Sequence, residues 1–185
     1  MMGPDLMSIA VQPSPDLSGR PVAAADARVF VETYGQLFEH SPWVVERAWA
    51  KRPFADAEAL LASFGEVLDE ALPEKRLALV RAHPELADKL AIAKGLTESS
   101  AGEQAGAGLD RLSPAEFETF SALNRAYRER FGFPFVICVR LNDKASILAA
   151  MRERLGHGQD GELAAALVQI GLIARLRLAD IRVRP

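Results

Sequence analysis

The chain has 185 residues, of which 49% are hydrophobic and 25% are charged, and its formal net charge is −3 at pH 7. This composition predicts a folded domain with a sizeable core and excludes a chain that is disordered throughout. The slightly acidic balance disfavours a nucleic-acid-binding protein, because such proteins usually present a strongly basic face. The single cysteine, Cys138, excludes an intramolecular disulfide and a multi-cysteine zinc site.

Segments that direct a protein into a membrane or out of the cell are not evident in the sequence. No apolar run is long enough to span a bilayer, and the first residues lack the charged and apolar regions of a secretory signal. We therefore expect a cytoplasmic protein with neither a membrane nor a nucleic acid as its partner.

The beginning of the chain differs in composition from the rest. Prolines recur there among serine and glycine, at Pro4, Pro13, Pro15 and Pro21. We expect residues 1–24 to form a flexible N-terminal tail and residues 25–185 to form one helical domain.

Helix starts are marked by capping residues and prolines that precede apolar residues at helical spacing. The residues that mark these starts are Asp26, Ser41, Asp56, Pro73 and Ser113. The clearest start is Ser113-Pro114-Ala115-Glu116, which has serine at the N-cap and glutamate at the third helical position. The last two helices are predicted over residues 145–154 and 162–180.

The run Phe133–Val139, with the sequence FPFVICV, is the one segment with strand character. Because no second candidate strand could pair with it, we expect an extended apolar segment and not part of a sheet. The predicted class is therefore all-α, a compact single-domain bundle of roughly eight helices.

Ser100, Glu103 and Gln104 are spaced so that they share one face of a helix. Two interpretations remain open. The three side chains could line a polar pocket, or Ser100 and Glu103 could form a capping box at a helix start. Three nearby glycines favour the pocket, because they suggest a close approach of backbone or ligand. They are Gly102, Gly106 and Gly108.

His83 lies directly before Pro84, which we expect to begin a short helix. The imidazole would then lie near a helix N-terminus, where the dipole favours the neutral form. Histidine is the usual general acid or base near neutral pH, but a lone histidine is more often structural. His40 also precedes a predicted helix, so spacing alone does not separate the two.

Several motifs in one order resemble the OHCU decarboxylase family. These motifs are HPEL from His83, S-x-x-EQAGAGLD from Ser100, LNRAY from Leu123, FGFPFVICVR from Phe131, FEHSPWVVERAWAKRPF from Phe38 and IARLRLADI from Ile173. The similarity covers about residues 25–181. It implies an enzyme that converts 2-oxo-4-hydroxy-4-carboxy-5-ureidoimidazoline, a small molecule, to (S)-allantoin in urate breakdown. Because the family is commonly dimeric, it also implies a homodimer.

The resemblance also implies which residues form the site. The catalytic residues would be His83, Glu103 and Arg177, with Arg175 as the alternative if the alignment slips by two positions. The substrate-binding residues would be Pro84, Ser100, Gln104, Phe135, Val136, Ile137, Cys138 and Val139. Without the resemblance, Phe135–Val139 would be taken as plain core.

We expect neither a metal nor another cofactor. His83 and the nearby glutamates do not form a metal-binding motif, and the glycines after Glu103 lack the lysine of a phosphate-binding loop. Decarboxylation at a ring carbon can also leave its electron pair on the ring itself. The alternative to an enzyme is a helical dimerisation or regulatory module, which the apolar stretch Leu163–Ile181 could serve.

Overall fold

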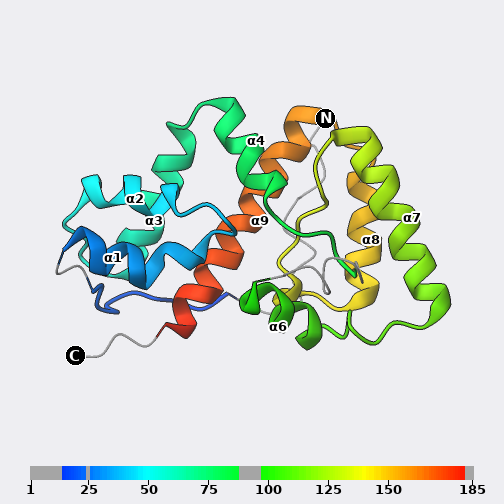
Figure 1. Ribbon diagram of the computed structural model, residues 1–185, viewed down its shortest axis with the longest axis horizontal. Coiled ribbons are helices and arrows are strands. Elements are labelled where there is room, and N and C mark those ends of the chain that lie inside the picture. Colours follow the sequence, from blue (N-terminus) through cyan, green and yellow to red (C-terminus); the bar gives the residue numbers. More distant parts are fainter. Residues whose placement is uncertain (1–13, 24–25, 88–96, 182–185) are drawn as a thin grey trace, which may run out of the picture. The chain divides into compact units, whose positions relative to one another are not determined.

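The computed structural model describes residues 14–23, 26–87 and 97–181 (Figure 1). Within these ranges the chain forms eight α-helices and no strand, which confirms the predicted all-α class. The described residues form two compact units. One unit consists of residues 84–162, and the other consists of residues 14–83 together with the chain from 163 onward.

The unit that contains the N-terminal half of the chain includes four complete helices and most of the last one. They are α1 (Ala27–Tyr34), α2 (Trp43–Ala48), α3 (Ala57–Asp69), α4 (Pro73–Arg81) and α9 (Gln159–Asp180) from Leu163 onward. The short 3-10 helices Gly35–Leu37 and Trp49–Lys51 follow α1 and α2.

Two of the predicted caps in this unit are confirmed and one is wrong. The Asp26 side chain accepts a hydrogen bond from the Val29 N–H at the start of α1, and Asp56 does the same for Ala59 in α3. Ser41 does not cap α2. That helix begins after Pro42 and its first turn has no side-chain cap, because proline itself occupies the N-cap position.

The core of this unit is aromatic. The Phe30 ring stacks on Phe54 with ring centroids 5.7 Å apart and contacts Tyr34 and Trp49 at its edges. Phe30, Tyr34, Val44, Val45 and Leu60 are almost inaccessible to solvent, so α1, α2 and α3 share one packed interior.

Residues 14–23, the described part of the predicted N-terminal tail, make specific hydrogen bonds. The Leu17 N–H donates to Glu58, the Gly19 N–H donates to Asp56, and the Leu17 side chain is buried. Residues 1–13 lie outside the described part of the chain, so the boundary of the tail stays a prediction.

The other unit contains α6 (Glu98–Gly106), α7 (Pro114–Phe131), α8 (Lys144–Arg154) and the first residues of α9. Figure 1 shows α7 and α8 side by side. The capping box predicted at Ser113 is confirmed, and Gly132 ends α7 with a left-handed φ of 73°.

The segment between α7 and the 3-10 helix Val139–Leu141 runs through the interior without forming a strand, as predicted. Its residues from Phe133 to Cys138 are buried, and the rings of Phe133 and Phe135 pack at right angles or nearly so against Tyr127. An apolar sequence without a partner strand is therefore held by side-chain packing instead of a β-ladder.

None of the described helices is both long and apolar enough to cross a membrane.

Candidate active site

His83 lies just after Ala82, the C-cap of α4, and is 7% exposed. Its Nδ1 atom lies 3.0 Å from the Leu79 carbonyl oxygen. Because a carbonyl can only accept, Nδ1 carries the proton, and Nε2 of the neutral ring is the acceptor nitrogen. Burial lowers the pKa of His83 to about 4, and the hydrogen bond to Leu79 opposes this shift. The imidazole is therefore neutral at physiological pH.

The predicted helix start at Pro84 is wrong. Residues 84–87 are not helical, and residues 88–96 lie outside the described part of the chain. His83 instead terminates the last turn of α4, where its backbone N–H donates to the Val80 carbonyl. Burial and not a helix dipole keeps the ring neutral.

Arg177 on α9 and Glu39 form a buried ion pair in the same unit as His83. The Arg177 Nη1 atom lies 3.1 Å from the Glu39 Oε2 atom, and the two residues are 7% and 2% exposed. Both charges reach His83, because Glu39 raises its pKa and Arg177 lowers it, each by less than burial does. Glu39 was missed by the sequence analysis, although it lies in the FEHSPW stretch that carries the family resemblance.

Arg175, the alternative to Arg177, has a different environment. Its Nη1 atom donates to the Pro15 carbonyl and its Nη2 atom lies 2.8 Å from a carboxylate oxygen of Glu58. These contacts tie the segment before α1 to α3 and α9. Arg175 therefore has a structural role that accounts for its charge, whereas Arg177 shares its surroundings with the candidate histidine.

The capping-box interpretation of Ser100 and Glu103 is wrong. The N-cap of α6 is Thr97, whose side chain accepts a hydrogen bond from the Ser100 N–H. Ser100 is thus the third residue of the helix, where it is 5% exposed, and Glu103 lies one turn further on. Glu103 therefore does not take part in capping the start of α6.

Gln104 holds the loop that follows Pro84. Its Oε1 atom accepts from the Ala87 N–H at 3.0 Å, and its Nε2 atom donates to the Glu85 carbonyl at 3.4 Å. The Asn124 amide donates to the Leu86 carbonyl at 2.8 Å. These contacts fix Ala87 in a left-handed conformation with φ of 58°, which is uncommon for a residue other than glycine.

Glu103 lies near the predicted substrate-lining segment. The pKa of the buried Cys138 thiol is raised to about 11, first by burial and second by the negative charge of Glu103. The 3-10 helix that begins at Val139 also packs against α6. The structure therefore brings Glu103 and Phe135–Val139 together within one unit.

The backbone of this segment is only partly paired. The Val136 carbonyl accepts from Arg154, and the Cys138 carbonyl accepts from the Leu141 N–H and the Asn142 side chain. Among the described residues, no group forms a hydrogen bond with the N–H or the C=O of Ile137, although Ile137 is only 5% exposed. A buried donor and acceptor are thus available to a ligand.

The glycines of α6 do not mark a close approach of protein backbone, and their role in the approach of a ligand stays a prediction. A Cβ atom added at Gly102 or Gly106 would meet nothing within 4 Å. Gly108 has equally open space but a φ of 75°, so its need for glycine is conformational. In the described ranges, no group of three histidine, cysteine or carboxylate side chains could hold a metal ion.

Comparison with known proteins extends over most of the chain. The sequence profile of the OHCU decarboxylase family matches residues 23–179. A 2-oxo-4-hydroxy-4-carboxy-5-ureidoimidazoline decarboxylase of Haloferax volcanii is 42% identical over 165 residues, which are 89% of this chain and 96% of that protein. The protein of the same name from Amia calva is 41% identical over 162 residues, which are 88% of this chain and 93% of its own length.

Solved structures agree on the fold. A crystal structure of (S)-allantoin synthase superposes with a TM-score of 0.64 at 29% identity, and the match covers 83% of this chain and 50% of that one. A crystal structure of OHCU decarboxylase in the presence of (S)-allantoin gives a TM-score of 0.62 at 20% identity, and covers 78% of this chain and 93% of that one.

Proposed function

Because the chain belongs to the OHCU decarboxylase family, we propose that it converts 2-oxo-4-hydroxy-4-carboxy-5-ureidoimidazoline to (S)-allantoin in urate breakdown. The observation that carries the proposal is the family match over nearly the whole chain, together with a buried, neutral His83 in the same surroundings as Arg177. The proposal extends to a cytoplasmic enzyme that needs no cofactor.

The reaction can proceed on the substrate's own ring. The bond between ring carbon 4 and its carboxylate breaks, CO2 leaves, and the electron pair passes through carbon 5 to the adjoining ring nitrogen. The ring nitrogen takes a proton from water. The enol at carbon 4 then loses its hydroxyl proton, and a proton is added at carbon 5. The protein has to hold the carboxylate out of the ring plane and add this proton to one face only.

We assign the proton transfers to His83. A neutral imidazole can donate a proton only after it has accepted one, and Nε2 is the nitrogen that can accept. In this scheme Nε2 takes the proton of the carbon 4 hydroxyl and delivers it to carbon 5. Delivery to a single face would give (S)-allantoin instead of a racemate.

The other predicted residues bind and orient the substrate in this proposal. Arg177 pairs with oxygens of the substrate carboxylate or ring, because a guanidinium offers two parallel donors. Glu103 orients the ring hydroxyl and the ureido group. Contacts to the ring come from Pro84, Ser100, Gln104 and the main chain of Phe135, Val136, Ile137, Cys138 and Val139. The buried donor and acceptor of Ile137 support this last assignment.

We also propose a homodimer, formed through α9 and α3. A groove of about 620 Å³ runs between these two helices and is lined by apolar residues that include Leu61, Leu167 and Leu172. Val168 on its edge is 63% exposed, which is unusual for a large apolar side chain. The same groove also supports the alternative, in which the protein is a non-enzymatic dimerisation or regulatory module.

Turnover of freshly generated substrate tests the proposal and separates it from this alternative. The wild type should release CO2 and yield optically active (S)-allantoin, whereas His83→Asn should lose at least about 10²-fold in rate, as expected for a general acid or base. Circular dichroism checks that the variant is folded. An inactive wild type would rule out the enzyme and favour the interaction module.

A further inference from the structure

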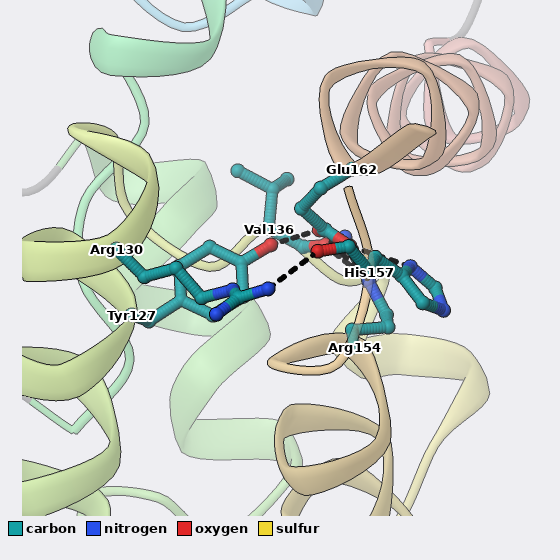
Figure 2. A network of polar contacts seen from close by, with 6 residues as sticks. All are labelled: Tyr127, Arg130, Val136, Arg154, His157 and Glu162. Atoms are coloured by element: carbon teal, nitrogen blue, oxygen red, sulfur yellow. Dashed lines mark hydrogen bonds and ion pairs between the residues drawn. The ribbon is translucent and has the colours of Figure 1, made fainter. Parts of the chain in front are cut away.

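A network of buried polar side chains surrounds Glu162 at the start of α9 (Figure 2). The Glu162 carboxylate is inaccessible to solvent and accepts hydrogen bonds from the Tyr127 hydroxyl and from two nitrogens of Arg154. The His157 Nδ1 atom lies 2.9 Å from its second oxygen. Three elements of one unit, α7, α8 and the beginning of α9, meet at this carboxylate.

The network holds two opposite charges in the interior. Burial raises the pKa of Glu162 to about 8. The Tyr127 hydroxyl and the Arg154 guanidinium donate to its carboxylate, and such donors favour the charged form against burial. Burial lowers the pKa of Arg154 to about 10, so the guanidinium remains charged at neutral pH. A buried ion pair of this kind adds little to stability compared with apolar residues of similar volume. Its main effect is then to fix the positions of the side chains that it joins.

Through Arg154 the network contacts the two residues that precede Ile137. The Arg154 Nη1 atom donates to the Val136 carbonyl at 2.9 Å, and the guanidinium carbon lies 4.5 Å from the centroid of the Phe135 ring. One side chain thus holds two consecutive residues of the segment. Figure 2 shows the Val136 carbonyl facing the network.

Ile137 follows directly, and its N–H and C=O form no hydrogen bond with any described residue. An amide N–H beside a carbonyl is the pattern that complements the –NH–CO– group of a cyclic urea. With Phe135 and Val136 held in place, the peptide groups of Ile137 have a defined orientation before a ligand arrives, and such preorganisation lowers the cost of binding.

We propose that Arg154, itself held by Glu162, is a positioning residue that orients the main-chain donor and acceptor of Ile137 toward the ureide ring of the substrate. The inference rests on the proposed function and adds a residue that does not touch the substrate. Arg154 acts on ring binding, so its loss should change KM more than kcat.

Two variants test the inference. Arg154→Lys keeps a positive charge beside Glu162 but lacks the fork that also reaches Val136. If this variant does not fold, a triple variant with Tyr127→Phe, Arg154→Met and Glu162→Leu removes the buried polar groups together and leaves no unpaired buried charge. Arg152→Lys is the matched control, because Arg152 lies on the same helix and is exposed.

The measurements are the melting temperature, kcat, KM and the Kd of (S)-allantoin, which retains the ring. Arg154→Lys should raise KM and Kd about tenfold, as expected for the loss of one or two neutral hydrogen bonds, with kcat within about threefold of wild type. A merely structural role would lower the melting temperature and leave KM and Kd of the folded protein unchanged. That result, with both constants within twofold of wild type, overturns the inference.

The wild type supplies an independent readout. The amide resonance of Ile137 should shift when (S)-allantoin is titrated into the labelled protein, and an unmoved resonance overturns the inference whatever the variants do. A wild type that neither turns over the substrate nor binds (S)-allantoin overturns the proposed function and this inference together. If the wild type turns over the substrate but one of these results contradicts the role of Arg154, the inference fails and the proposed function stands.

Discussion

Glu39 and Arg177 form an ion pair in the protein interior, with 3.1 Å between the Glu39 Oε2 atom and the Arg177 Nη1 atom. The pair fixes the direction of the guanidinium, to which the Leu37 carbonyl adds a weaker contact at 3.5 Å. Glu39 therefore helps to set the position of the Arg177 guanidinium. The sequence analysis did not identify Glu39 as a site residue.

Replacement of Glu39 by glutamine tests this relationship. Glu39→Gln keeps the shape but removes the negative charge that pairs with the buried Arg177, so we expect a loss of about 3–5 kcal/mol of stability. The value of kcat/KM should fall at least about tenfold, because Arg177 loses the carboxylate that directs its guanidinium and a misplaced group binds substrate less well. Glu46→Gln, an exposed change on α2, is the control. Unchanged kcat/KM in the folded variant would contradict the assigned role of Arg177.

The low pKa of His83 makes stability depend on pH. The folded state has a pKa of about 4 and the unfolded state about 6.5, so between these values only the unfolded state takes up the proton. The free energy of unfolding should therefore be reduced as the pH falls through this window, by about 3 kcal/mol in total. Urea unfolding of the wild type and of His83→Asn at several pH values measures the effect. Parallel curves for the two proteins would show that His83 is not buried in its neutral form.

Glu103→Gln distinguishes chemistry from helix capping. Since Thr97 caps α6, the change should leave the melting temperature nearly unaltered. If Glu103 orients the substrate as proposed, turnover should fall by at least about 10²-fold. Glu98→Gln, which changes an exposed carboxylate in the first turn of the same helix, should leave turnover unaltered. A Glu103→Gln protein that is active but less stable would show that Glu103 has a structural role and does not orient the substrate.

Sequence patterns predicted the fold well where local chemistry decides the outcome. Asp26, Asp56 and Ser113 cap helices as expected because each side chain competes for the N–H groups of its own first turn. The pattern around Ser100 was ambiguous for the same reason. Thr97 precedes it by three residues and can make the same contact, and only the backbone conformation decides between the two.

The parts of the candidate site that depend on distant residues could not be predicted in this way. The partner of Arg177 is 138 residues away in sequence, and Arg154 on α8 donates to Val136 in the extended segment before that helix. No spacing rule connects such positions. The family resemblance predicts which residues form the site, whereas their burial and their pairing with distant residues follow from the three-dimensional structure.

Activity should survive removal of metal ions. No described cluster of side chains is suited to hold a metal, and the electron pair released on decarboxylation can be accommodated by the substrate ring. We expect full turnover after exhaustive treatment with EDTA and with no coenzyme added. The measurement is the rate of (S)-allantoin formation before and after dialysis. A chelator-sensitive rate that one metal restores would require a different mechanism.

The proposed dimer can be tested at Val168. Light scattering should give about twice the chain mass of 20.1 kDa for the wild type. Val168→Glu places a charge at the edge of the groove and should yield a monomer with an unchanged helical spectrum. Leu72→Glu changes an equally exposed apolar residue outside the groove and should remain dimeric. A wild-type monomer at micromolar concentration would contradict the proposal.

The two hydrogen bonds of Gln104 restrict the order of the acidic and amide residues at positions 103 and 104. The amide accepts from Ala87 and donates to Glu85, whereas a carboxylate at this position could only accept and would meet the Glu85 carbonyl as a second acceptor. A glutamate at position 104 would therefore release the loop after Pro84 even though its size is the same. Exchange of the neighbours Glu103 and Gln104 conserves composition and net charge. It would nevertheless remove the donor to the Glu85 carbonyl from position 104 and the carboxylate from position 103.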